Sequence, residues 1–209
     1  MCVRKCLSGM AMCVAALGVA VAVGACDRPK PQAIVVPVAH PTGGVELKDV
    51  DGVARRPLDV NGAAGAVVLF IASDCPISNS YAPEINRICA QYGGEGPGKF
   101  RFYLVHVDQD FRPEDAKAHA IAYDYTCPVL MDGQRVLCKK LGATVTPEAF
   151  VIGEGGAVLY KGRIDDKWVG YMKSRADPTT RDLRAALEAV RAGRPVTTAV
   201  TEAIGCPIG

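Results

Sequence analysis

The sequence predicts an α/β domain with a central mixed β-sheet, helices on both faces and an N-terminal hairpin extension. Two observations support this fold class. Apolar strand segments alternate with helical segments between residues 66 and 123, and an antiparallel hairpin followed by an amphipathic helix comes later in the chain. Alternation implies parallel strands joined by right-handed crossovers, and the later hairpin adds antiparallel strands, so the sheet is mixed.

Length and charge limit the classes of function. The chain has 209 residues and is 49% hydrophobic, which suffices for one core of good size. The formal net charge is only +2, and the lysines and arginines are scattered. Because no basic stripe is present to neutralise a phosphate backbone, we expect no nucleic acid partner.

The first 25 residues read as an export signal. Two basic residues near the start precede an uncharged apolar run from residue 11 to residue 23, which is short for a membrane span. The run ends in Val-Gly-Ala-Cys at 23–26, which resembles a bacterial lipobox. Cys26 would then be the first mature residue and carry a lipid anchor to the membrane; the alternative is an ordinary cleaved signal in which Cys26 is incidental.

These features divide the chain into four segments. The signal peptide is 1–25, and a Pro-rich tether follows at 26–44. The folded domain spans 45–193, and 194–209 forms a C-terminal tail that contains Cys206. We therefore predict a protein of the bacterial cell envelope, facing the periplasm and held there by a lipid.

The segments at the start of the domain predict a hairpin and then a buried strand. Val45–Leu47 and Ala54–Val60 flank an Asp-Gly pair, which is a typical hairpin turn. The next segment, Ala66–Ile71, is continuously apolar and rich in Val, as in a strand buried on both faces. It leads directly into Cys75 and Pro76.

The remaining elements follow from apolar periodicity and from Gly and Pro positions. Because proline fits the first turn of a helix, Pro76 places Cys75 at a helix N-terminus. The two-stranded hairpin has a Gly-Gly turn, and the last helix begins with Asp177 as its cap. In order, we predict a helix to Tyr92, a strand at 100–107, a helix at 113–123, a short extended segment at 128–130, a short helix at 134–141, hairpin strands at 149–152 and 157–160, and a helix ending at Gly193.

Cys75 is the residue type and position that best predicts chemistry. The unpaired N–H groups and the dipole of a helix N-terminus stabilise negative charge, so a thiol placed there is shifted toward the nucleophilic thiolate. The neighbouring Asp74 opposes this effect. We expect Cys75 to be an exposed, ionisable thiol rather than a small core residue.

Three motifs in the expected order resemble the thioredoxin superfamily. They are Phe-Ile-Ala-Ser-Asp-Cys-Pro at 70–76, Thr-Pro-Glu-Ala-Phe-Val at 146–151 and Tyr-Lys-Gly-Arg-Ile-Asp-Asp at 160–166. More narrowly, they are similar to the redoxin branch that includes alkyl hydroperoxide reductase and thiol-specific antioxidant proteins. The resemblance covers residues 45–193 and implies a thioredoxin-like fold.

The resemblance also implies roles for residues. Cys75 would be the reacting sulfur, and Thr146-Pro147 would be a cis-proline site whose backbone pairs with an extended substrate. Pro76, Thr146 and Pro147 are therefore our candidate substrate-binding residues. No cofactor is implied.

Two departures from the related patterns bear on the activity. Dithiol thioredoxins carry a second cysteine three residues after the first, where this chain has Ser78. Peroxiredoxins carry a threonine three residues before the reactive cysteine, where this chain has Ala72. Loss of the second thiol removes fast internal resolution of a mixed disulfide, and loss of the threonine removes a hydroxyl that would orient peroxide.

A second sulfur is therefore sought elsewhere in the chain. On a continuous helix Cys89 would lie about 21 Å from Cys75, too far for a disulfide, so we expect it in the core. Cys138 also reads as a packing residue. The catalytic candidates are Cys206, on the tail, and Cys127; the alternative is a static Cys127–Cys206 or Cys138–Cys206 bridge. Metal-ligand spacings are missing from the sequence, so we predict no metal site.

Three hypotheses of function remain open at this point. The first is an envelope thiol–disulfide oxidoreductase that exchanges disulfides with protein substrates through Cys75. The second is a thiol peroxidase in which Cys75 attacks a small peroxide and Cys206, Cys127 or an external thiol resolves the sulfenic acid. The third is a non-enzymatic lipoprotein that uses the same fold to bind a redox partner. The absence of threonine at position 72 favours the first.

Overall fold

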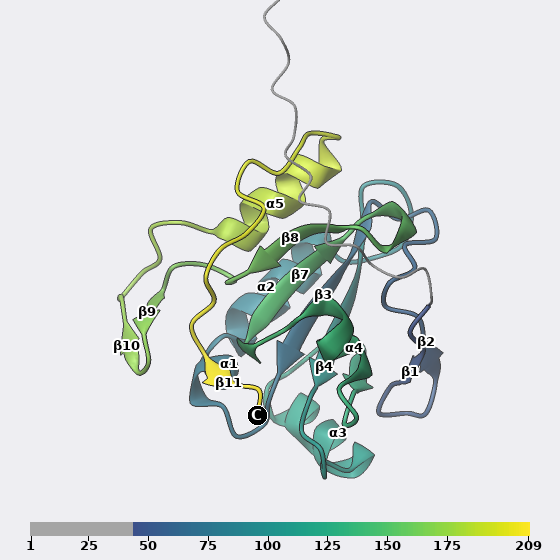
Figure 1. Ribbon diagram of the computed structural model, residues 1–209, viewed down its shortest axis with the longest axis vertical. Coiled ribbons are helices and arrows are strands. Elements are labelled where there is room, and N and C mark those ends of the chain that lie inside the picture. The colour runs from purple at the N-terminus through teal and green to yellow at the C-terminus, as the bar shows by residue number, and fades with distance from the viewer. Residues whose placement is uncertain (1–43) are drawn as a thin grey trace, which may run out of the picture. The chain divides into compact units, whose positions relative to one another are not determined.

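The central element of the computed structural model, which describes residues 44–209, is a five-stranded sheet (Figure 1). The strand order is β5-β4-β3-β7-β8. Strand β3 pairs in parallel with β4, as does β4 with β5, whereas β7 pairs antiparallel with both β3 and β8. The predicted mixed sheet is confirmed, with strands β3 (Gly65–Ile71), β4 (Phe100–His106), β5 (Val129–Met131), β7 (Glu148–Ile152) and β8 (Val158–Gly162).

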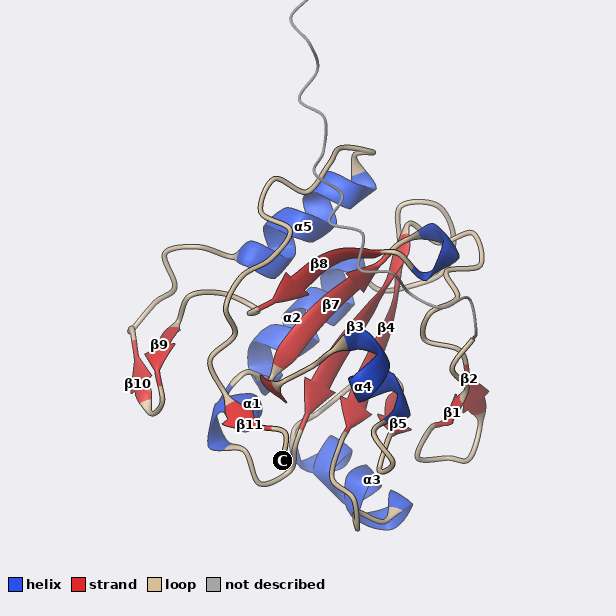
Figure 2. Cartoon of the chain, in the orientation of Figure 1, coloured by secondary structure: helices blue, strands red, loops and turns tan. Residues whose placement is uncertain are grey.

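Helices cover both faces of this sheet because the side chains of the buried strand β3 alternate between two cores. Leu69 and Ile71 pack with residues of α2 (Ala82–Tyr92) and α5 (Asp182–Arg191). Val68 and Phe70 pack on the opposite face with α4 (Val136–Leu141). Figure 2 shows α2 and α5 behind the sheet and α4 in front of it. The flanking helices predicted for this α/β fold are confirmed.

The signal peptide and lipidated Cys26 lie outside the described residues, as does nearly all of the Pro-rich tether. Within the described part, the predicted N-terminal hairpin is present as β1 (Leu47–Lys48) and β2 (Ala54–Arg55), which pair antiparallel. Helix α3 (Pro113–Ala122) agrees with its prediction within one residue. Within residues 44–209, no helix combines the length and the apolar character needed to cross a membrane.

Two predicted helices differ from the structure. The helix expected to continue to Tyr92 is divided into α1 (Pro76–Ser80) and α2, because Pro83 lies in the first turn of α2 and a proline cannot continue a helix from the preceding turn. The last helix begins at Asp182 rather than after Asp177. Asp166 accepts hydrogen bonds from the backbone N–H groups of Thr179 and Thr180, which holds that stretch in an extended loop.

Two short strand pairs were not predicted from the sequence. Strands β9 (Trp168–Gly170) and β10 (Lys173–Ser174) form a hairpin after β8. Strand β6 (Val145–Thr146) pairs antiparallel with β11 (Cys206–Pro207), with Cys206 opposite Thr146. The second pair positions the C-terminal tail beside the loop that contains Pro147.

Candidate active site

Cys75 occupies the point where the chain leaves β3 and enters α1. It is the N-cap of α1, its sulfur accepts a hydrogen bond from the backbone N–H of Ser78 at 3.3 Å, and Pro76 lies in the first turn, as predicted. The expectation of an exposed thiol is wrong for this conformation, since Cys75 has no accessible surface. Ile204 and Cys206 of the C-terminal tail pack on the core that contains it.

The loop at Thr146 and Pro147 faces this sulfur. The peptide bond between the two residues is cis, as predicted. The Cys75 thiol donates a hydrogen bond to the Thr146 carbonyl at 3.1 Å, although the two residues are 71 positions apart in sequence. Strand β7, which begins directly after Pro147, pairs with β3 and so brings the two loops together.

Cys206 brings a second sulfur to the same place. Its backbone pairs with Thr146 across β6–β11, and its thiol lies close enough to that of Cys75 to interact with it. Burial raises the pKa of the Cys206 thiol, and the neighbouring Cys75 and Asp74 charges raise it further. The raised pKa favours the protonated form of the Cys206 thiol.

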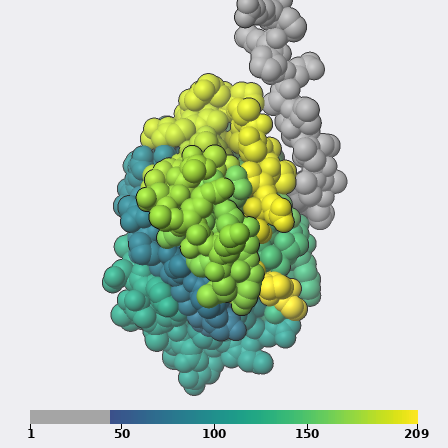
Figure 3. Space-filling view, turned by 90° about the vertical axis from the view of Figure 1, so that its left-hand side faces the viewer, coloured from purple at the N-terminus to yellow at the C-terminus, as the bar shows by residue number. Residues whose placement is uncertain are grey.

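Hydrogen bonds attach the tail to β8 and to the residue that follows this strand, at a point upstream of Cys206. The N–H of Lys161 donates to the Ala199 carbonyl at 2.9 Å, and the N–H of Thr201 donates to the Lys161 carbonyl at 3.0 Å. The Thr201 hydroxyl contacts the Tyr160 hydroxyl at 2.7 Å and accepts from the N–H of Arg163 at 3.0 Å. Figure 3 shows the tail, in yellow, on the molecular surface beside the light-green segment that contains β9 and β10.

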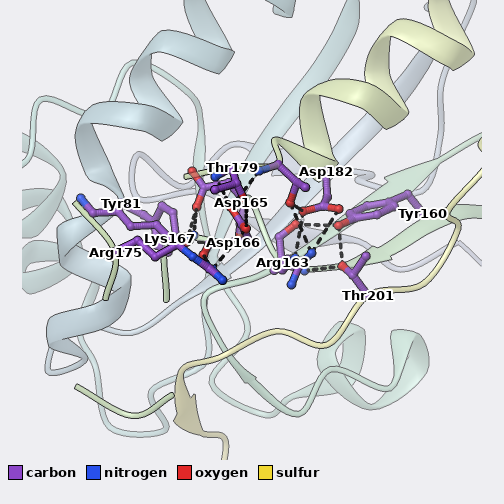
Figure 4. A network of polar contacts seen from close by, with 11 residues as sticks. Tyr81, Tyr160, Arg163, Asp165, Asp166, Lys167, Arg175, Thr179, Asp182 and Thr201 are labelled. Atoms are coloured by element: carbon purple, nitrogen blue, oxygen red, sulfur yellow. Dashed lines mark hydrogen bonds and ion pairs between the residues drawn. The ribbon is translucent and has the colours of Figure 1, made fainter. Parts of the chain in front are cut away.

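A network of carboxylates holds the loop after β8 against the helix that follows Cys75 (Figure 4). The Tyr81 hydroxyl donates to Asp165 at 2.6 Å, and burial together with this carboxylate raises the Tyr81 pKa. Hydrogen bonds from Thr179 and Thr180, with the nearby Arg175 guanidinium, hold the Asp166 pKa at about 2. Asp165 and Asp166 come from the third motif, which sequence reasoning identified without assigning this contact to Tyr81.

A second network supports the loop that precedes Cys75. The backbone N–H of Ser73 donates to Asp108 at 3.3 Å, and Nδ2 of Asn79 donates to the Ser73 carbonyl at 2.8 Å. Asp108 also contacts Nδ1 of His106, and Asn79 contacts Nε2 of His119. Burial lowers the His119 pKa to about 4, and the neighbouring His106 lowers it in the same direction. Sequence spacing contains no signal for this network, because three different elements meet in it.

The remaining cysteines require one correction. Cys89 and Cys127 form a disulfide, with their Cα atoms 6.7 Å apart. Cys127 therefore has no free thiol to resolve Cys75, and the alternative Cys127–Cys206 bridge is excluded while this disulfide is present. Cys89, which was expected to be a simple core residue, is a disulfide partner. No local pattern in the sequence links these two residues, because Cys89 of α2 and Cys127 before β5 meet only through packing in the same core. Cys138 is free and buried.

The described residues also bear on metal binding. Between residues 44 and 209, no three His, Cys, Asp or Glu side chains lie together in an arrangement that could hold a metal ion. Three of the predicted site residues, Cys75, Thr146 and Cys206, meet at one point.

The fold and the pair of thiols define the class of the protein: a redoxin with a thioredoxin-like fold, and hence an oxidoreductase in general terms. The chain belongs to the AhpC/TSA family, whose model matches residues 38–161. The matched range contains Cys75 and Pro147, and the tail with Cys206 lies outside it. A search of curated proteins finds no match.

Solved structures with a similar fold include two proteins of comparable length. An uncharacterised conserved protein from Geobacillus kaustophilus is 28% identical, with a TM-score of 0.69, over 80% of this chain and 88% of that one. A hypothetical protein, SMc02350, from Sinorhizobium meliloti is 27% identical, with a TM-score of 0.69, over 80% and 91% of the two chains. StoA from Bacillus subtilis is 16% identical, with a TM-score of 0.50, over 73% and 97%, and shows similarity of fold alone.

Proposed function

We propose that this protein is a thiol–disulfide oxidoreductase of the bacterial envelope that acts through Cys75 and is resolved by Cys206. The observation that carries the proposal is the meeting of these two sulfurs beside Thr146. Ser78 stands where dithiol relatives have their second cysteine, and the tail supplies a thiol from a different part of the chain.

The proposed cycle transfers one disulfide. The Cys75 thiolate attacks one sulfur of a substrate disulfide, so that a bond forms to Cys75 and the other substrate sulfur leaves as a thiolate. Cys206 then loses its proton and attacks the Cys75 sulfur. This step releases the second substrate thiol and leaves a Cys75–Cys206 disulfide, which an external thiol reductant returns to two thiols.

The envelope location is part of the proposal. It is supported by the basic and apolar start of the chain and by the lipobox-like sequence ending at Cys26. The Cys89–Cys127 disulfide agrees with an oxidising compartment. Labelling of cells with a fatty acid should mark the wild-type protein and leave a Cys26→Ser variant unlabelled; equal labelling of both would contradict the lipid anchor.

Turnover of a disulfide-linked reporter peptide, with dithiothreitol as electron source, tests the catalytic proposal. Cys75→Ser should abolish the protein-dependent rate. Cys206→Ser protein, reduced and then freed of dithiothreitol, should accumulate a mixed disulfide between Cys75 and the peptide, visible by mass spectrometry. Cys138→Ala is the matched control, because Cys138 is buried and free but lies in the opposite core. Wild-type turnover by Cys75→Ser would refute the proposal.

The same preparations separate disulfide exchange from peroxide reduction. Rapid consumption of hydrogen peroxide by the reduced protein, with no turnover of the reporter peptide, would assign the site to a thiol peroxidase instead. Ala72, which stands in place of the threonine of peroxiredoxins, is nearly buried in the apolar core beside Cys75 and offers no hydroxyl. We therefore expect the disulfide reporter to be the better substrate.

A further inference from the structure

The burial of Cys75 means that the tail and a substrate compete for one place. Cys75 has no accessible surface, and Ile204 and Cys206 of the tail pack on the core cluster that contains it. A substrate disulfide can reach this sulfur only after the covering segment has moved away. The tail is free to do so without unfolding the domain, since its attachment at Thr201 precedes the covering residues.

The tail lies in an extended conformation that an incoming polypeptide can reproduce. It pairs with β6 as a short antiparallel strand, with Cys206 opposite Thr146 and Pro207 opposite Val145. The N–H of Ile208 donates to the Thr144 carbonyl at 2.9 Å. This pairing places the sulfur of the residue opposite Thr146 against Cys75, so a substrate cysteine that reacts there takes the position of Cys206.

The residue before that cysteine faces a close backbone contact. A β-carbon added to Gly205 would lie 2.6 Å from the carbonyl carbon of Thr146 and 3.2 Å from the nitrogen of Pro147, and closer still to the Thr146 oxygen. The obstructing atoms belong to the backbone and not to a flexible side chain, so the space cannot open by a rotamer change. Only glycine fits at this position.

We propose that residues 204–206 are a bound substrate mimic, so that the protein prefers extended polypeptide segments in which glycine directly precedes the reactive cysteine. This inference rests on the proposed function and deepens it by naming the substrate class. Ile204 adds a preference for an apolar residue before the glycine, because its side chain packs on the same core. After the mixed disulfide has formed, return of the tail displaces the product and delivers Cys206 to the bond.

Activated peptides test this preference without turnover. A nonapeptide with the sequence of residues 201–209 and a copy with alanine in place of the glycine are each prepared as the mixed disulfide with thionitrobenzoate. The Cys75 thiolate of Cys206→Ser protein attacks the peptide sulfur, forms a protein–peptide disulfide and expels thionitrobenzoate, whose absorbance is recorded. The glycine peptide should react about tenfold faster or more, the size expected when a buried backbone contact is overpacked.

Two comparisons make the outcome decisive. Free cysteine in place of the protein should react with both peptides at similar rates. Adding Gly205→Ala to the Cys206→Ser protein should displace the tail from Thr146 and so raise the reaction rate of the glycine peptide. Adding Gly209→Ala should leave that rate unchanged, because Gly209 has open space around it. Equal fast reaction of both peptides with the Cys206→Ser protein would overturn the inference and leave the proposed function standing. Reaction of neither peptide faster than with free cysteine would overturn the proposed function itself.

Discussion

The Cys89–Cys127 disulfide should contribute strongly to stability, and its magnitude follows from its position in the chain. The bridge closes a loop with a sequence separation of 38 residues. The chain-entropy relation for a loop of that length gives about 4 kcal/mol, through restriction of the unfolded chain. A Cys89→Ser/Cys127→Ser double variant should therefore be less stable by about this amount.

Urea unfolding followed by circular dichroism measures this difference. With a slope of about 2 kcal/mol per molar urea, the midpoint of the double variant should fall by about 2 M. The slope should rise, because the unlinked chain exposes more surface when it unfolds. Cys138→Ala is the control, because it removes a cysteine that forms no disulfide. The reference is wild-type protein in which the Cys89–Cys127 disulfide has formed. An equal urea midpoint for this protein and the double variant would refute the loop-entropy reasoning.

Two further predictions concern the networks around the site. Tyr81→Phe removes the hydroxyl that donates to the buried Asp165 carboxylate and should lower the free energy of unfolding by about 2 kcal/mol. The control Tyr171→Phe, at an exposed tyrosine, should leave the free energy of unfolding unchanged. Equal effects of the two variants in thermal unfolding would contradict this prediction. The folded pKa of His119 is about 4, below the ordinary histidine value of 6.5, so the unfolded state takes up a proton at a higher pH than the folded state does. This residue therefore lowers the free energy of unfolding as the pH falls from about 6.5 to 4. Between pH 7 and pH 5, wild type should lose about 2 kcal/mol more than His119→Gln; parallel pH profiles would exclude this contribution.

Much of the fold could be predicted because local pattern and tertiary structure agree. Ala66–Ile71 is apolar throughout and is buried on both faces as the middle strand. Pro76 marked the helix start, and Thr146-Pro147 marked the cis peptide through the resemblance. Where long-range contacts override local pattern, the prediction failed: the carboxylate of Asp166 holds the chain extended where a helix start was expected.

The site was only partly predictable for the same reason. Cys75 and Pro147 are identified by local motifs, and Cys206 was a candidate through its glycine-flanked place on the tail. Its pairing with Thr146 depends on a two-residue strand, which is too short to leave a periodic pattern. The Cys89–Cys127 bridge was missed because the two residues are 38 positions apart and meet only through packing in one core.

The most direct test of this account is disulfide mapping of the protein after equilibration in a glutathione redox buffer. Peptide mass spectrometry should find a Cys75–Cys206 link that appears and disappears with the buffer potential, while Cys89–Cys127 persists and Cys138 stays free. Oxidised protein in which Cys75 and Cys206 both remain thiols, or in which Cys206 is linked to Cys138, would contradict the central claim that the tail supplies the second sulfur.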